Sequence, residues 1–242
     1  MRILVVVPLV GTQFNREVEE EFAAGAAPGT EIRVVNLDEG PQSIESECEE
    51  ALAVPDFLRK AKRAEESGFD AIICDCFGDP GVRAAREAVG IPVIGPGEAS
   101  MLLAATLGRK FSVVTVLRSV FPMIEALAWH AGVDRKLASM RSVDIPVLEL
   151  LDKERMVAAL HEQMIHAIQD DDAHVLVLGC TGMMGVAKQL EARLAGSGLE
   201  VPVVDPVAAA LKQAETLVAL GLRQSRRTYT RPKSFQTVRN AA

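Results

Sequence analysis

Short runs of apolar, largely β-branched residues alternate along the chain with longer stretches in which apolar residues recur at helical spacing. The apolar runs predict eight strands, at residues 3–7, 32–36, 71–75, 92–95, 111–117, 146–150, 174–179 and 202–205. The helical stretches include 55–67 and 152–169. Because helices separate the strands, and because the strands are apolar throughout, the pattern predicts parallel sheets covered by helices on both faces.

The second half of this pattern repeats the first. One strand ends in Cys76 and its counterpart ends in Cys180, and a Pro-Val strand follows later in each half. That strand leads into an alanine-rich helix ending in Leu-Gly, over 90–108 and again over 200–221. We therefore expect two similar lobes. Since ligands of parallel sheets bind beyond the carboxyl ends of strands, Cys76 and Cys180 are expected to face one cleft.

Composition narrows the classes of partner. The 242 residues carry a net charge of −7 with one Trp and one Tyr, which disfavours a nucleic-acid partner. No apolar run approaches the roughly 18 residues of a membrane span, so no membrane partner is expected. Four cysteines in this length do not make a disulfide framework, and the first strand leads into charged residues without a cleavage site. We therefore expect a reducing, cytoplasmic setting.

Each of the two cysteines lies between a strand and a predicted helix. Pro80 suits the first turn of a helix, with Asp79 as its cap. The positive potential of a helix start predicts a lowered thiol pKa, and glycines such as Gly78 and Gly182 would let a substrate approach the backbone. One thiol on each side of a cleft suits removal of a proton from one face of a carbon and delivery to the other.

Competing interpretations of the cysteines are weaker. Cys74 reads as strand packing and Cys48, in a polar run, as a bystander. A C-x-C metal site needs more ligands, and the four histidines show no zinc spacing, so we expect no metal. The chain has no GxSxG elbow, no phosphate-binding G-x-x-x-x-G-K motif and no GxGxxG after the first strand, so these catalytic templates are unsupported.

Five segments resemble the aspartate/glutamate/hydantoin racemase superfamily, most of all its hydantoin and allantoin racemase branch. They are CFGDPG (76–81), GEA (97–99), FSVVTVL (111–117), VLGCTGM (177–183) and VVDPV (203–207). The resemblance implies an α/β fold of two pseudo-symmetric, Rossmann-like lobes, each with a four-stranded parallel sheet. The lobes would span 1–97 and 98–205, with a last helix at about 206–222 packing on the first lobe. The basic tail 223–242 is expected to be a mobile end or an arm against a neighbouring subunit.

The same resemblance implies cofactor-independent racemisation in a homo-oligomer, with Cys76 and Cys180 as the catalytic pair. Phe77-Gly78 after the first cysteine and Gly182-Met183 after Thr181 favour a cyclic ureide over a free amino acid. The family motifs also imply a set of substrate-binding positions. These are Pro8, Phe77, Gly78, Asp79, Glu98, Thr115, Val116, Thr181 and Gly182.

Two departures from the family sequence leave more than one substrate class to consider. The usual Asn-Pro-Asn-Thr loop after the first strand reads Val7-Pro8-Leu9-Val10 here, and a usual Thr-Thr pair is Thr115-Val116. The altered loop, together with Arg118, motivates an alternative amino-acid racemase or small-dicarboxylate isomerase. A small-molecule binding protein without turnover is a third hypothesis, and the presence of both cysteines argues against it.

Overall fold

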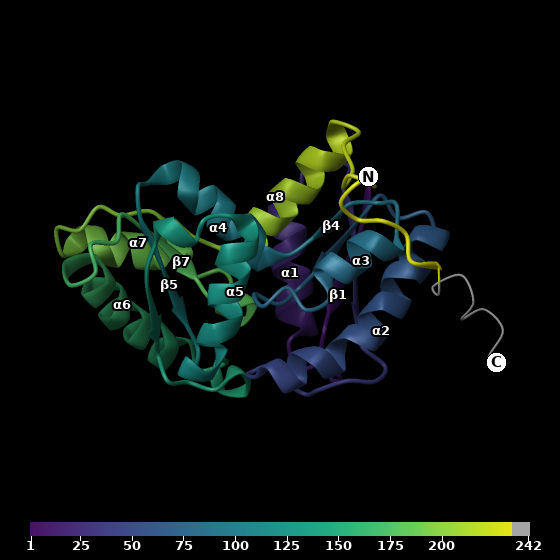
Figure 1. The fold of residues 1–242 in the computed structure, drawn as a ribbon. Helices are drawn as coiled ribbons and strands as arrows, with labels where there is room; N and C mark the ends of the chain where they lie inside the picture. Colours follow the sequence, from purple (N-terminus) through teal and green to yellow (C-terminus); the bar gives the residue numbers. More distant parts are fainter. Residues whose placement is uncertain (234–242) are drawn as a thin grey trace.

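Two four-stranded parallel sheets form the centres of two lobes that lie side by side (Figure 1). The computed structural model describes residues 1–233. The strand orders are β2-β1-β3-β4 and β6-β5-β7-β8, so the second sheet repeats the first and the predicted fold class is confirmed. The first sheet contains β1 (Arg2–Val7), β2 (Glu31–Asn36), β3 (Ala71–Cys74) and β4 (Val93–Ile94). The second contains β5 (Phe111–Thr115), β6 (Leu137–Ser142), β7 (Val175–Leu178) and β8 (Val203–Val204).

Helices cover the sheets and join the lobes. They are α1 (Asn15–Gly25), α2 (Glu47–Glu66), α3 (Val82–Ala88), α4 (Pro96–Leu107), α5 (Phe121–Ala131), α6 (Lys153–Gln169), α7 (Ala187–Gly196) and α8 (Pro206–Ala219). Helix α4 leads from the first sheet to the second, and α8 returns from β8 to pack on α1, α4, β3 and β4 (Figure 1). The chain therefore crosses between the lobes twice.

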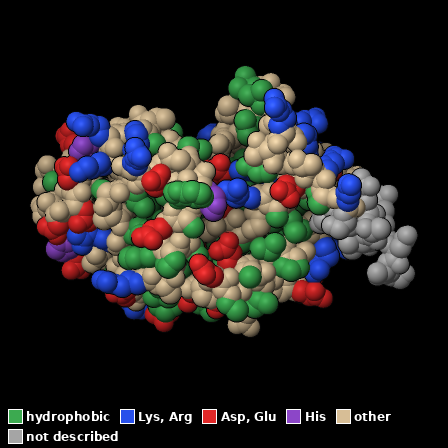
Figure 2. Space-filling view, in the orientation of Figure 1, with side chains coloured by type: hydrophobic (Ala, Val, Ile, Leu, Met, Phe, Trp, Pro, Cys, Tyr) green, Lys and Arg blue, Asp and Glu red, His purple; other side chains and the backbone are tan. Residues whose placement is uncertain are grey.

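Burial explains why the inner strands are so apolar. Every residue of β3, β5 and β7 is buried, because helices cover both faces of each sheet. The outer strands β2 and β6 are mostly half-buried and contain polar residues. On the outer surface, hydrophobic side chains and charges of both signs are interspersed (Figure 2). Within residues 1–233, no helix is long and apolar enough to cross a membrane.

The strand predicted at 146–150 is wrong. The second sheet instead takes its edge strand from β6, whose sequence LASMRS alternates between small, polar and apolar residues. Pro146 precedes a 3-10 turn at Val147–Glu149, which buries Val147 and Leu150 on one side. An apolar spacing of three residues suits that turn, and the apolar content of the segment alone could not distinguish it from a strand.

The first part of the basic tail lies on its own chain. Gln224 exchanges hydrogen bonds with the backbone of Val93, and the Arg226 guanidinium donates to the carbonyl oxygens of Arg86 and Glu87. The Tyr229 hydroxyl lies 3.3 Å from an Arg86 nitrogen. Residues 222–233 thus cover α3 and β4 of the first lobe, while 234–242 lie outside the described residues.

Candidate active site

Cys76 and Cys180 occupy equivalent positions in the two lobes and line one cavity. Each lies two residues beyond the end of its strand, Cys76 after β3 and Cys180 after β7. Both side chains are half-buried and are free thiols. The expectation that the repeat brings them to a shared site agrees with this geometry.

The cavity has a volume of about 50 Å³ and walls from both lobes. Most of its lining is apolar: Val7, Leu9, Phe14, Val18, Ile44, Val147 and Met184. The polar lining consists of the two thiols together with Asp75 and Thr181, beside the backbone of Gly182. This volume has room for about three or four water molecules, well below the roughly 300–1,000 Å³ of typical ligand pockets. The walls must therefore separate before a ligand of typical size can enter.

Hydrogen bonds fix the two cysteine turns. Thr181 donates its hydroxyl to the backbone oxygen of Asp75 at 3.2 Å, which joins the lobes beside the cavity. The buried Thr115 donates to the oxygen of Gly179 at 2.9 Å, which holds the turn before Cys180. Both cysteines are thus presented from turns whose backbone is held in place.

The predicted lowering of the thiol pKa values is wrong for this closed cavity. Burial raises the pKa of Cys76 well above its ordinary value and that of Cys180 to about 12. The expected backbone N–H groups are present and act in the opposite direction, from Gly78 on Cys76 and from Gly182 and Met183 on Cys180. Desolvation outweighs them, because the sulfur atoms lie in a small apolar cavity.

Neighbouring acidic groups add to this effect. Besides burial, the opposite thiol and the carboxyls of Asp79 and Asp75 raise the pKa of Cys76. Asp75 and Glu45 likewise raise the pKa of Cys180. Both cysteines therefore rest as neutral thiols at pH 7.

Sequence reasoning missed Asp75. The residue is 4% exposed and lines the cavity, and among residues 1–233 no group hydrogen bonds with its Oδ1. Burial, aided by Asp205, raises the pKa of Asp75 to about 7, although the Thr181 hydroxyl opposes the shift. The signal was an ionisable residue at the end of a fully apolar strand, directly before the catalytic candidate.

The predicted binding residues after Cys76 support the turn and do not line the cavity. Phe77 is buried, and its backbone oxygen would lie 2.1 Å from a Cβ at Gly97, so the first turn of α4 packs directly on it. Asp79 accepts the N–H groups of Gly97 and Glu98 at 2.9 and 2.8 Å. The prediction that Asp79 caps the helix after Pro80 is therefore wrong: α3 has Gly81 at its N-cap, and Asp79 caps α4.

Of the other predicted positions, some line the cavity and some do not. Thr181 and Gly182 line the cavity, whereas Pro8 does not, although its neighbours Val7 and Leu9 do. Thr115 and Val116 are buried behind the Cys180 turn. Arg118 is exposed and borders a separate hollow with Arg141 and Asp171, away from the cysteines.

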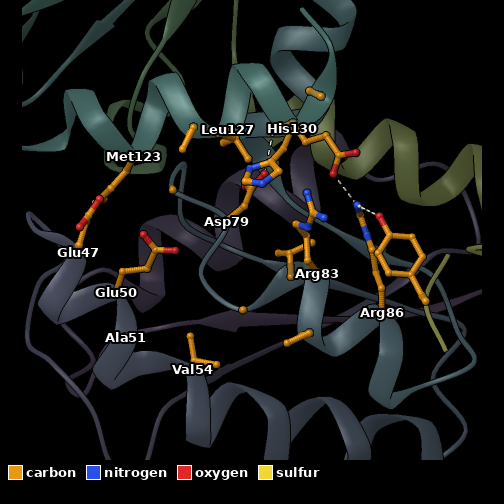
Figure 3. A pocket seen from close by; sticks show the side chains of 18 residues that line it. Glu47, Glu50, Ala51, Val54, Asp79, Arg83, Arg86, Met123, Leu127 and His130 are labelled. Carbon is orange, nitrogen blue, oxygen red and sulfur yellow. Dashed lines mark hydrogen bonds and ion pairs between the residues drawn. The ribbon is translucent and has the colours of Figure 1, made fainter. Parts of the chain in front are cut away.

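A larger hollow of about 550 Å³ is bordered by residues of α2, α3 and α5 (Figure 3). Gly78 and Asp79 border it, and the side chains of Glu50 from α2, Arg83 from α3 and His130 from α5 point toward it. Glu98 also borders it and pairs with Arg86 at 2.6 Å. Neither cysteine lines this hollow, so its size does not make it the reaction site.

Comparisons with known proteins now identify the fold and family. The model of the Asp/Glu/hydantoin racemase family matches residues 3–214. The chain belongs to this family. It is 37% identical to the hydantoin racemase of Pseudomonas sp. (strain NS671), over 98% of this chain and 94% of that protein. The protein is therefore a racemase, which is a class of isomerase.

Solved structures agree with this assignment. The allantoin racemase from Pseudomonas fluorescens superposes with a TM-score of 0.90 at 37% identity, covering 96% of this chain and 97% of that one. A glutamate racemase from Bacillus anthracis gives a TM-score of 0.64 at 19% identity, over 90% and 82% of the two chains, which shows a shared fold only. Among the described residues, no group of three or more His, Cys, Asp and Glu side chains could hold a metal ion.

Proposed function

We propose that the protein racemises a 5-substituted hydantoin or an allantoin-like cyclic ureide, without a cofactor, by proton transfer between Cys76 and Cys180. The observation that carries this proposal is the position of the two thiols, one from each lobe, on the wall of a single cavity. The hydantoin and allantoin racemases that this chain is 37% identical to support the substrate class.

The reaction needs one cysteine as a base and the other as an acid. A thiolate removes the proton from the carbon beside the carbonyl, and the electron pair of the broken C–H bond moves onto the carbonyl oxygen as an enolate. The opposite thiol then delivers its proton to the other face of that carbon and becomes the thiolate. The roles of Cys76 and Cys180 are reversed for the other enantiomer.

The charges around the cavity favour a neutral substrate. Among residues 1–233, no Lys, Arg or His side chain lines it, and the acidic side chains that act on the thiols include the carboxyls of Asp75, Asp79 and Glu45. An anionic dicarboxylate would meet these carboxyls without a cation to pair with, at a cost that a neutral ring avoids. Arg118, which motivated the dicarboxylate alternative, lies outside the cavity.

Solvent deuterium exchange tests the proposal directly. Each pure enantiomer of a panel of 5-substituted hydantoins, allantoin, amino acids and small dicarboxylates is incubated with the protein in D₂O. We expect loss of optical activity together with deuterium at the α-carbon for a cyclic ureide, with EDTA leaving the rate unchanged. Exchange only with amino acids would overturn the substrate class, and no exchange with any compound would overturn the proposed reaction.

A further inference from the structure

Asp75 differs from the other buried aspartates of residues 1–233, Asp56 and Asp79. Asp56 and Asp79 each accept two backbone N–H groups, and the half-buried Asp205 accepts three. Among residues 1–233, Asp75 Oδ1 accepts none, although the residue is only 4% exposed. A buried acceptor without a donor costs free energy, so native structures rarely keep one without a use.

The cavity offers this oxygen as its one strong acceptor among the lining side chains. The thiols of Cys76 and Cys180 are weak donors and acceptors, and the Thr181 hydroxyl already donates to the backbone oxygen of Asp75. The remaining lining side chains are apolar. A buried ring N–H therefore finds its strongest acceptor among these side chains at Asp75.

We propose that the Asp75 carboxylate accepts a hydrogen bond from a ring N–H of the substrate and thereby selects rings that carry this donor. This inference rests on the proposed racemisation of a cyclic ureide and names the residue that recognises it. A free amino acid or dicarboxylate would bring its carboxylate toward the same oxygen and be repelled. The unpaired oxygen of Asp75 thus gives the apolar cavity a preference for uncharged rings that carry an N–H group.

The ionisation of Asp75 follows from its surroundings. Cys74, Cys76 and Cys180 face it as neutral thiols, Asp205 acts on it from the start of α8, and Glu45 lies near Cys180. Without substrate the carboxyl is protonated below about pH 7. A protonated carboxyl accepts an N–H bond less well than a carboxylate, so substrate binding should weaken in that range.

Two variants test the role of Asp75 in racemisation of a 5-substituted hydantoin. Asp75→Leu removes the acceptor at similar size, and kcat/KM should fall about 100-fold. Asp75→Asn keeps an amide oxygen as acceptor, so its loss should be about tenfold or less. Methylation of one ring nitrogen should lower kcat/KM of the native protein at least about tenfold while leaving Asp75→Leu nearly unaffected.

The pH profile separates recognition from folding, even if Asp75→Leu fails to fold. For the native protein, log kcat/KM should rise with a slope of about one from pH 7 to 9, as a thiol ionises, and about two below pH 7. Asp75→Asn should keep a slope of about one throughout. Asp56→Asn, which removes a buried carboxyl that does not line the cavity, should keep the slope of about two below pH 7.

The outcomes distinguish the two proposals. If the native protein racemises a hydantoin but Asp75→Asn keeps the steeper slope below pH 7, or Asp75→Leu stays within about threefold of the native kcat/KM, the role of Asp75 is wrong and the function stands. If the native protein racemises no ureide, both proposals fall together. The inference is supported if Asp75→Asn loses the steeper slope of log kcat/KM below pH 7 while Asp56→Asn keeps it.

Discussion

The two lobes share a topology but differ at the residue before each cysteine. In the first lobe this residue is Asp75, with a free carboxyl oxygen at the cavity. In the second it is Gly179, where a Cβ would lie 2.6 Å from the Cβ of Thr115 and 2.7 Å from a methyl of Val113. The repeated scaffold thus places the two thiols at matched positions, while the residues beside them differ between the two sides of the cavity.

The supports of the two turns differ as well. The Cys76 turn is held by Asp79, which caps α4, and Arg86 pairs with Glu98 in the first turn of the same helix. Tyr229 from the tail lies against that arginine. The Cys180 turn relies on Thr115 and on tight packing around Gly179. The first turn is therefore supported by a polar network and the second mainly by close packing.

The largest expected effect comes from replacing either cysteine. Cys76→Ser and Cys180→Ser should each lower racemisation by at least about 1,000-fold, because one proton-transfer partner is lost in each. Since the remaining thiol still faces one side of the carbon, each variant should exchange the α-proton of one enantiomer, and the two variants should prefer opposite enantiomers. Racemisation at the native rate by either variant, measured by polarimetry, would contradict the two-base assignment.

The raised thiol pKa values predict an alkaline reaction. Because both thiols are neutral at pH 7, the fraction of thiolate should grow about tenfold per pH unit, and kcat about 100-fold between pH 7 and 9. The rate is measured by circular dichroism of a pure enantiomer in overlapping buffers. A kcat that is flat over this range would show that substrate binding itself lowers the pKa of one thiol below 7.

Most of the fold follows from the sequence because its inner strands are apolar on both faces. The pattern located β1, β3, β5 and β7 and the repeat that pairs Cys76 with Cys180. It missed β6, since a half-buried strand at the edge of a sheet needs less apolar sequence, and it mistook 146–150 for that strand.

The site was less predictable because its properties depend on burial. The sequence places a thiol at the start of a helical turn but does not show how small and apolar the surrounding cavity is. The pKa values of Cys76 and Cys180 were therefore predicted in the wrong direction. Asp79 caps α4, which begins 17 residues later in the chain, and that contact depends on how the Cys76 turn packs on this helix.

A smaller effect is expected on stability when Asp75 becomes Asn. The folded-state pKa of Asp75 is about 7, above its ordinary 3.8, so native stability should fall as pH rises from about 4 to 7, and Asn abolishes this loss. The difference between these two pKa values sets an upper limit of about 4 kcal/mol on the stability lost. We expect Asp75→Asn to be about 2 kcal/mol more stable than the native protein at pH 8. Urea unfolding at pH 4 and pH 8 measures it. An equal stability difference at both pH values would contradict the raised pKa.

Gly179, which in the second lobe occupies the position of Asp75, should tolerate even an added methyl group poorly. Gly179→Ala should lower the free energy of unfolding by about 1–3 kcal/mol, because the new Cβ meets Thr115 and Val113. Gly196→Ala, at the end of α7 with nothing within 4 Å of the added Cβ, is the matched control and should be neutral or slightly stabilising. Equal denaturation midpoints for the two variants would show that close packing around Gly179 does not distinguish the second cysteine turn from the first.

The smallest expected effect concerns the tail, for which the second lobe shows no equivalent in residues 1–233. Tyr229→Phe removes the hydroxyl that lies 3.3 Å from Arg86 but keeps the ring beside the guanidinium. Arg86 retains Glu98 at 2.6 Å and the oxygen of Val93 at 2.9 Å, so unfolding free energy should fall by only about 0.5–1 kcal/mol. Tyr229→Phe leaves intact the cap in which Asp79 accepts the backbone N–H of Glu98, so kcat should change less than about twofold. A loss of kcat beyond about tenfold with unchanged KM would instead make the tail a positioning element for the Cys76 turn.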